Sequence, residues 1–323
     1  MTKKVFVTGG LGLIGSHLTE ALLNLGNQVV ILDNESTGTV QNLEHLSSNR
    51  DLQLVDGDIL DVSKVESLME KSDFCFHLAA SLGVKKILAS PLSSYESNVH
   101  GTQNVLASAS KYGVPVFLAS TSEIYGDNPI QPLTEDSKRV LGSPLNIRWT
   151  YSEAKALDES LAKIYEREKG LRFIIGRFFN TVGPRQIGEY GMVLPRFVRS
   201  AMRDEAIQVY GDGSQSRVFC LVDDAVEAMI RLIDEPKSYG NVFNIGGEGE
   251  ISIKKLAELV IDVLNSKSNI ELVPYEIAYT EGFEETYRRV PDTSKLRELT
   301  GWTPKRSLET TIKDISDYLT DRN

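Results

Sequence analysis

Short apolar segments alternate with longer amphipathic ones along the first half of the chain. The short segments are rich in Val, Ile, Leu and Phe, a pattern that predicts strands buried on both faces of a parallel sheet. They lie at residues 4–8, 28–32, 52–55, 74–78, 116–119 and 173–178. Between them, apolar residues recur at helical spacing, as at 16–25, 63–71 and 95–111. This alternation predicts an α/β fold with a doubly wound parallel sheet.

The pattern changes after residue 180. Residues 180–217 are rich in glycine, proline and polar side chains, with one helix expected near 195–203. Such loop-rich segments often carry binding residues on a rigid scaffold. Strand and helix return at 219–232, and two further amphipathic helices are expected at 253–264 and 308–319.

A chain of 323 residues suits one large α/β unit or two domains that share a cleft. We expect a Rossmann-type nucleotide-binding domain of residues 1–179 plus about 215–240. Residues from about 180 to 214 plus 241–323 are expected to form a smaller, α-rich substrate domain.

The formal net charge of −10 argues against nucleic acid as a partner, because phosphate backbones are held by basic stripes. No apolar run reaches the length of a membrane span, and no signal-peptide core follows the N-terminus. Cys75 and Cys220 lie in apolar runs and are expected to be buried thiols of a cytoplasmic protein. The four histidines have no ligand spacing, so no metal site is expected.

A glycine-rich turn follows the first strand. Residues 9–15 read Gly-Gly-Leu-Gly-Leu-Ile-Gly, a helix comes next, and the second strand ends at Asp33. Glycines let the backbone approach a pyrophosphate, the helix N-terminus stabilises its charge, and Asp33 can accept hydrogen bonds from a ribose diol. A carboxylate would repel a 2′-phosphate. The pattern therefore predicts a site for NAD rather than NADP, with a simple tight turn as the alternative.

Candidate acid–base residues lie in two segments. Thr121 and Glu123 follow the strand 116–119, at the edge where open parallel sheets present their reactive groups. The Thr121 hydroxyl can share a proton with a substrate hydroxyl, and a buried Glu123 could act as an acid or a base. Tyr151 and Lys155 are four residues apart and would share one face of a helix. We expect the ammonium and the helix N-terminus to lower the pKa of Tyr151 and make it a base.

Over essentially its whole length the chain resembles the extended short-chain dehydrogenase/reductases that act on nucleotide sugars. The matching segments are Thr8 to Gly15, Asp33, Asp58-Ile59, His77 to Ala80, Asn98, Thr121, Tyr151 with Lys155, Asn180 to Arg185, Gly211 to Gly213, and Arg217. The resemblance implies a tightly held NAD that oxidises C4 of a nucleotide-bound hexose. It also implies a homodimer.

The motifs and the resemblance together assign roles to residues. The expected cofactor-binding residues are Gly9, Gly12, Leu13, Ile14, Gly15, Asp33, Asn34, Asp58, Ile59, Leu78, Ala79, Ala80, Asn98, Tyr151 and Lys155. By resemblance, Asp58 and Ile59 would contact adenine. The expected substrate-binding residues are Ser122, Asn180, Arg185, Arg217 and Arg289. By resemblance, Asn180 and Arg217 would lie at the nucleotide diphosphate, with the loops of 182–210 around the base.

Members of this family differ in the reaction that the 4-keto sugar undergoes after C4 oxidation. A uronate decarboxylase needs a cation for the C6 carboxylate and an acid to reprotonate C5. The sequence Thr121-Ser122-Glu123 is similar to the motif of UDP-glucuronate decarboxylases. Arg148, three residues before Tyr151, gives a pattern that resembles the decarboxylase of the aminoarabinose pathway. Arg289 belongs to a segment similar to the Arg-x-Pro of those decarboxylases, and arginine binds carboxylates bidentately.

We therefore expect decarboxylation of UDP-glucuronate to a UDP-pentose, either the 4-keto sugar or xylose, with Thr121, Glu123, Tyr151, Lys155 and Arg148 as catalytic residues. The alternative is a 4-epimerase of UDP-glucose or UDP-glucuronate. A 4,6-dehydratase fits less well, because family dehydratases usually have Asp where this chain has Ser.

Several observations leave the reaction open. Arg148 could instead form a surface ion pair. The loop at 81–86 resembles neither decarboxylase group, and residues 185–193 resemble UDP-glucose 4-epimerases equally. A non-catalytic protein that binds NAD or a sugar nucleotide is the alternative to an enzyme.

Overall fold

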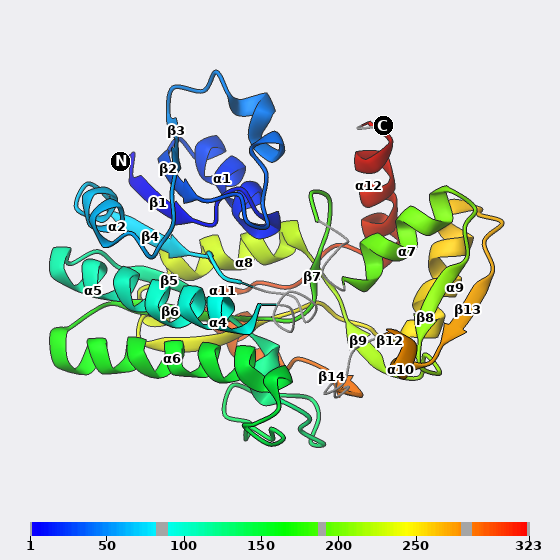
Figure 1. Cartoon of the computed structure of the whole chain (residues 1–323). Helices are drawn as coiled ribbons and strands as arrows, with labels where there is room; N and C mark the ends of the chain where they lie inside the picture. Colours follow the sequence, from blue (N-terminus) through cyan, green and yellow to red (C-terminus); the bar gives the residue numbers. More distant parts are fainter. Residues whose placement is uncertain (1, 82–89, 187–191, 279–285, 322–323) are drawn as a thin grey trace.

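A parallel sheet of seven strands, in the order β11-β6-β5-β4-β1-β2-β3, is the frame of the molecule in a computed structural model (Figure 1). The structure describes residues 2–81, 90–186, 192–278 and 286–321. The strands are β1 (Lys4–Thr8), β2 (Gln28–Asp33), β3 (Leu52–Asp56), β4 (Phe74–His77), β5 (Val116–Thr121), β6 (Phe173–Phe178) and β11 (Asn241–Ile245). All neighbouring pairs in this sheet are parallel, so the predicted fold class is confirmed.

Helices cover both faces of the sheet because successive strand residues point to opposite sides. In β1, Val5 and Val7 pack with one hydrophobic cluster, which also contains residues of α1 (Leu13–Asn24), α8 (Val222–Asp234) and α11 (Ser294–Thr300). The intervening Phe6 packs with a second cluster. That cluster contains residues of α2 (Val62–Met69), α5 (Thr102–Tyr112) and α6 (Thr150–Lys169).

The helix predicted over residues 95–111 starts earlier and is interrupted. It consists of α4 (Pro91–Tyr95), a π-helical turn over Glu96–Gly101, and α5. The Thr102 hydroxyl donates a hydrogen bond to the Asn98 carbonyl at 2.5 Å. In an α-helix that carbonyl would accept from the backbone N–H of residue 102, so the side chain competes with the regular pattern. Helical spacing in a sequence does not reveal this competition.

A smaller part of the chain lies beside the sheet, on the right of Figure 1. Its core is shared by α7 (Val193–Met202), α9 (Ile253–Leu264) and α12 (Leu308–Thr320). A parallel pair of strands, β8 (Ile207–Tyr210) and β13 (Ile270–Val273), and the short helix α10 (Tyr275–Ala278) belong to the same region. The predicted helices near 195–203, 253–264 and 308–319 are therefore confirmed.

Two small sheets lie between the large sheet and this region (Figure 1). One pairs β7 (Thr181–Val182) with β10 (Cys220–Leu221), and the other has the order β12-β9-β14. Its strands are β12 (Glu250–Ser252), β9 (Ser216–Val218) and β14 (Arg288–Arg289). Short helical turns complete the described chain: η1 (Val40–Leu46), η3 (Ser122–Tyr125), η4 (Ile147–Trp149) and η6 (Pro236–Ser238).

Part of the segment after residue 240 returns to the large sheet. β11 is its edge strand, and the buried Trp302 packs in the same cluster as α1 and α8. The Trp302 indole N–H donates to the Asp224 carbonyl at 2.9 Å. The sequence pattern assigns all of residues 241–323 to the substrate domain. The limits of the two domains stay a prediction. No described helix is both long and apolar enough to cross a bilayer.

Candidate active site

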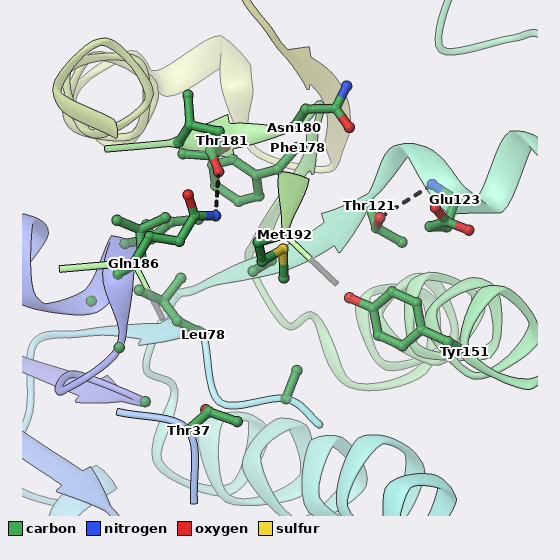
Figure 2. Close-up of a pocket in the computed structure, with 18 of the residues that line it drawn as sticks. Thr37, Leu78, Thr121, Glu123, Tyr151, Phe178, Asn180, Thr181, Gln186 and Met192 are labelled. Carbon is green, nitrogen blue, oxygen red and sulfur yellow. Dashed lines mark hydrogen bonds between the residues drawn. The ribbon is translucent and has the colours of Figure 1, made fainter. Parts of the chain in front are cut away.

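A cavity of about 470 Å³ opens at the carboxyl ends of the central strands, between the large sheet and the smaller region. Nearly all of the predicted site residues line it, from both parts of the chain. Figure 2 shows Tyr151 and Thr121 projecting into this space from α6 and β5, with Met192 across the gap. Three predicted residues, Asn98, Ser122 and Lys155, do not line the cavity.

The glycine turn at residues 9–15 is packed so tightly that a side chain on Gly9 or Gly15 would collide with neighbouring backbone atoms. Gly9 has φ +72°, and a Cβ there would lie 2.7 Å from the Ala79 nitrogen. A Cβ on Gly15 would lie 2.1 Å from the Gly9 carbonyl oxygen. At Gly12, by contrast, the nearest atom would be 3.5 Å away, an ordinary contact, and this residue lines the cavity. The turn therefore presents bare backbone and the N-terminus of α1, which together suit a pyrophosphate.

Asp33 stands at the end of β2 on the wall of the cavity. Its Oδ2 accepts the Leu11 N–H and its Oδ1 accepts the Glu35 N–H, both at 2.9 Å. Burial raises the pKa of this carboxyl despite those bonds. Nearby, the Asn34 amide donates to Asp58 at 2.7 Å. This corner can hold a ribose diol beside the apolar side chain of Ile59, which also lines the cavity.

Asn98 holds a cavity-lining loop in place rather than lining the cavity itself. Its side-chain oxygen accepts the Ser81 N–H at 2.8 Å, and its amide donates to the Ser81 carbonyl at 3.0 Å. The preceding residues, Leu78, Ala79 and Ala80, do line the cavity. Asn98 thus supports this loop in the ligand-free protein, and its contact with the cofactor stays a prediction. The rest of this loop, at 82–89, lies outside the described residues.

Tyr151 lies in the first turn of α6, one helical turn before Lys155. The pKa of its hydroxyl is raised, first by burial and then by the negative charges of Glu123 and Asp158, while a hydrogen bond from Thr121 opposes the rise. The expectation that Lys155 would lower this pKa is therefore wrong for the ligand-free protein. Lys155 is paired with Asp158 at 3.0 Å and does not act on Tyr151 as an uncompensated charge.

Glu123 is clamped between two arginines from distant segments. Arg148 Nη2 lies 2.7 Å from Glu123 Oε2, and Arg289 Nη1 pairs with Oε1. Burial would raise the pKa of this carboxyl, but the charges of Arg289 and Arg148 outweigh it and hold the pKa well below its usual range. Glu123 is thus a carboxylate in the ligand-free protein, and of the two roles that the sequence allows, acid or base, the role of acid requires it to gain a proton first.

Both arginines are buried, with side chains 5% and 8% exposed, so Arg148 does not form a surface ion pair. The Ser122 hydroxyl lies 3.5 Å from Arg289 Nη1, behind the clamp. The Arg289 Nε hydrogen has no acceptor among the described residues. The two arginines together hold one carboxylate, that of Glu123, and the Arg289 Nε hydrogen remains available as a donor.

Three other predicted substrate residues line the cavity at different places. The Asn180 amide donates to the Val218 carbonyl at 2.8 Å, and Arg217 Nη1 donates to the Ser216 carbonyl at 2.8 Å. Arg217 and Arg289 are register partners on the paired strands β9 and β14. Arg185 pairs with Glu20 of α1 at 2.7 Å, and its contact with the substrate stays a prediction. Residues 187–191, within the segment expected around the base, lie outside the described residues.

Sequence reasoning missed several lining residues: Thr37, Phe178, Gln186, Met192, Arg196 and Tyr210. The guanidinium of Arg196 lies 4.0 Å above the Tyr210 ring, at the end of the cavity formed by the smaller region. The Gly-Asp-Gly directly after Tyr210 is one of the recognised motifs and could have pointed to it. The buried partner of Lys155, Asp158, was also missed, although a spacing of three residues in a helix is typical of an ion pair.

Comparisons with known proteins agree with this geometry. The family model described as "NAD dependent epimerase/dehydratase family" matches residues 5–246. The UDP-N-acetyl-alpha-D-glucosaminuronate decarboxylase of Bacillus cytotoxicus is 42% identical over 98% of both chains. UDP-glucuronic acid decarboxylase 1 of Arabidopsis thaliana is 35% identical over 98% of this chain and 69% of that protein. The structure of UDP-glucuronic acid 4-epimerase from Bacillus cereus, with UDP-glucuronic acid and NAD, has TM-score 0.89 and 27% identity over 99% of this chain and 100% of that one.

Proposed function

Because the chain belongs to the NAD dependent epimerase/dehydratase family, we propose that it oxidises C4 of a UDP-linked hexuronate and then releases the C6 carboxylate as carbon dioxide. The observation that carries this proposal is the pair of buried arginines, Arg148 and Arg289, on one carboxylate beside Tyr151. Relatives that cover nearly the whole chain are named as decarboxylases of UDP-linked uronates, which supports the same reaction.

The cofactor of this family is NAD, and the residues present fit it. The bare backbone at Gly12 and the N-terminus of α1 would hold the pyrophosphate, and Asp33 would accept the ribose hydroxyls. When bound in its oxidised form, NAD supplies the acceptor for the hydride that leaves C4.

Tyr151 would take the proton from the C4 hydroxyl as the hydride leaves, which turns C4 into a ketone. The Thr121 hydroxyl, which is hydrogen-bonded to Tyr151, would share that proton. Tyr151 is protonated in the ligand-free protein, because burial and two neighbouring carboxylates raise its pKa. The base must therefore lose its proton after the site has filled.

The ketone at C4 makes the C6 carboxylate a β-keto acid. The C5–C6 bond then breaks, its electron pair moves into an enolate over C5 and C4, and carbon dioxide leaves. Arg148 and Arg289 would orient the carboxylate before that step. One proton at C5 then gives the 4-keto pentose; the hydride taken from C4 would leave with the reduced cofactor, or would return to C4 if the product is xylose.

Glu123 would supply that proton, but only after it has gained one. A substrate carboxylate on the same two arginines places a second negative charge beside Glu123 and raises its pKa. The glutamate then takes up a proton from solvent as the substrate binds and can pass it to C5. This order of events explains how Glu123, which is ionised in the ligand-free protein, could act as an acid during the reaction.

Two hexuronates share the C4–C6 chemistry and differ at C2. The relative at 42% identity is named for the N-acetylated uronate, and relatives at 35–36% identity are named for the glucuronic acid.

Incubation of the holoenzyme with UDP-glucuronate and with UDP-N-acetylglucosaminuronate, followed by measurement of carbon dioxide release and product mass, tests the proposal. Loss of carbon dioxide from either supports it, and the higher kcat/KM identifies the substrate. A 4-epimer of unchanged mass from both, without carbon dioxide, would overturn decarboxylation in favour of epimerisation.

We also propose a homodimer in the cytoplasm. Apolar side chains of α4 and α6 remain exposed on the outer face of these adjacent helices: Leu92 (70%), Tyr95 (40%), Leu157 (46%) and Ile164 (46%). A second copy that packs on this face would cover them. Sedimentation of the holoenzyme at its working concentration tests this.

The two buried free thiols, Cys75 and Cys220, support a reducing compartment.

A further inference from the structure

A buried ion pair lies directly beneath the proposed base. Lys155 Nζ and Asp158 Oδ2 are 3.0 Å apart on α6, with side chains 3% and 1% exposed. Neither residue lines the cavity. A charge pair this deep costs desolvation energy that hydrophobic residues would avoid. We therefore expect the Asp158 carboxylate to have a role other than stabilisation of the helix.

The surroundings of Asp158 leave it dependent on Lys155. The Asn98 carbonyl can only accept, so the Thr102 hydroxyl donates to it and in turn accepts from the His77 Nε2–H. Two more hydrogen bonds continue this series from His77 to the backbone of Ala79. The Ala79 N–H lies 3.2 Å from the Thr8 hydroxyl, which lies 2.7 Å from His77 Nδ1. His77 Nε2 lies 3.0 Å from the Thr102 hydroxyl, which lies 2.5 Å from the Asn98 carbonyl.

The Thr102 hydrogen therefore points to Asn98, and His77 carries a proton on Nε2. Burial lowers the pKa of His77 to about 3, so the ring is neutral and its Nδ1 accepts from Thr8. Asp158 Oδ1 accordingly has no hydrogen-bond donor within the described residues. The ammonium of Lys155 is then the group that compensates the charge of Asp158.

Several charged groups face Tyr151 or its lysine. Glu123 approaches Tyr151 from η3, but its charge is already matched by two arginines. Glu159, next to Asp158, is held by Arg177 of β6 at 2.6 Å. Neutral His77 of β4 faces Lys155. Asp158 is thus the carboxylate whose removal would leave the lysine charge uncompensated beside the tyrosine.

We propose that Asp158 is a positioning residue for the reaction: its buried carboxylate holds the Lys155 ammonium and offsets its charge, so that Tyr151 keeps its proton until the site is filled. Removal of the Asp158 charge should then favour the phenolate. The inference rests on Tyr151 acting as the base in the proposed function.

The test compares Asp158→Asn with the wild type, each saturated with NAD and without substrate. Ultraviolet titration of tyrosinate, taken as the difference from the same protein carrying Tyr151→Phe, reports Tyr151 alone. The Asn variant should titrate about one pH unit lower or more. An unchanged or higher midpoint would overturn the proposal. If the Asn variant does not fold, Asp158→Ser, which is smaller and also neutral, carries the same expectation.

Two controls separate charge from structure. Asp158→Glu keeps the charge and should titrate within a few tenths of a pH unit of the wild type, on the same electrostatic argument. Glu166→Gln removes the acid of an exposed Lys163–Glu166 pair with the same spacing on α6, and should leave the midpoint unchanged. A shift in Glu166→Gln equal to that in Asp158→Asn would also overturn the proposal.

A second readout uses UDP-glucose, which has a C4 hydroxyl but no carboxylate. The rate at which it reduces bound NAD in a single turnover should rise with pH, and that rise should move to lower pH in Asp158→Asn by the same amount. A shift in the opposite direction would show that Lys155 was merely misplaced and would refute the charge argument. Neither readout requires decarboxylation, so each stands or fails separately from the carbon dioxide assay.

Discussion

Arg148 Nη2 lies 2.7 Å from Glu123 Oε2, which joins the turn before α6 to the end of β5 across the cavity floor. This contact places a cation three residues from the proposed base and beside the proposed acid. It connects proton transfer at C4 with the fate of the group attached at C5.

Arg148→Met should reduce carbon dioxide release from the uronate at least about a hundredfold, because one of the two groups that hold the reacting carboxylate is lost. NAD binding should be unchanged, and so should single-turnover oxidation of UDP-glucose, which lacks the carboxylate. Arg139→Met removes an exposed arginine that pairs with Glu153 at the start of α6 and is the matched control. Full uronate turnover by Arg148→Met would rule out the proposed role.

Binding of the uronate should take up close to one proton more per site near neutral pH than binding of UDP-glucose, because both present the C4 hydroxyl to Tyr151 but only the uronate carries a carboxylate. The arginines hold the pKa of Glu123 low before binding, and the second carboxylate raises it on binding. Calorimetry in buffers of different ionisation enthalpy measures this uptake directly. The Glu123→Gln variant should show no such difference between the two substrates, and a difference equal to that of the wild type would assign the proton to another group.

Glu123 should also contribute to stability in a pH-dependent way. Its folded-state pKa lies below the unfolded value of about 4.3, so the ionised clamp stabilises the fold above that pH. The contribution is lost as the pH falls from there toward the folded-state pKa. The free energy of unfolding, measured with urea from neutral pH to pH of about 3, should therefore fall less steeply in Glu123→Gln than in the wild type. Parallel curves would contradict this.

Gly12 and Gly15 should respond differently to alanine. At Gly15 a Cβ would overlap the Gly9 carbonyl, so Gly15→Ala should lower the melting temperature of the protein even without cofactor. At Gly12 a Cβ would meet its nearest protein atom at 3.5 Å, an ordinary contact. Gly12→Ala should keep the melting temperature but bind NAD at least about tenfold more weakly, since a methyl group would occupy space needed by the pyrophosphate. Thermal unfolding and NAD titration of both variants check this.

Much of the frame could be read from the sequence, because buried parallel strands and amphipathic helices have local signatures. The glycine turn and Asp33 could be placed from the order of elements alone. The π-helical turn before Thr102 could not be predicted, since it depends on one hydroxyl that competes for one carbonyl.

Charge states in the site depend on partners far away in the chain. Glu123 is ionised because Arg289, 166 residues later, reaches it. The pKa of Tyr151 is raised by burial and by the charges of Glu123 and Asp158, which lie 28 residues before it and seven after it. Spacing in a sequence identifies which groups are present but not how their charges balance.

The pairing of β9 with β14 sets a fixed length in the substrate site. Arg217, the proposed diphosphate contact, and Arg289, the proposed carboxylate contact, are register partners, and hydrogen-bonded strands keep a constant separation. In the proposed function, this strand pair would fix the distance between the diphosphate and the C6 carboxylate. A sugar acid without its nucleotide would reach only one of the two arginines, so the site would select substrate length as well as substrate charge.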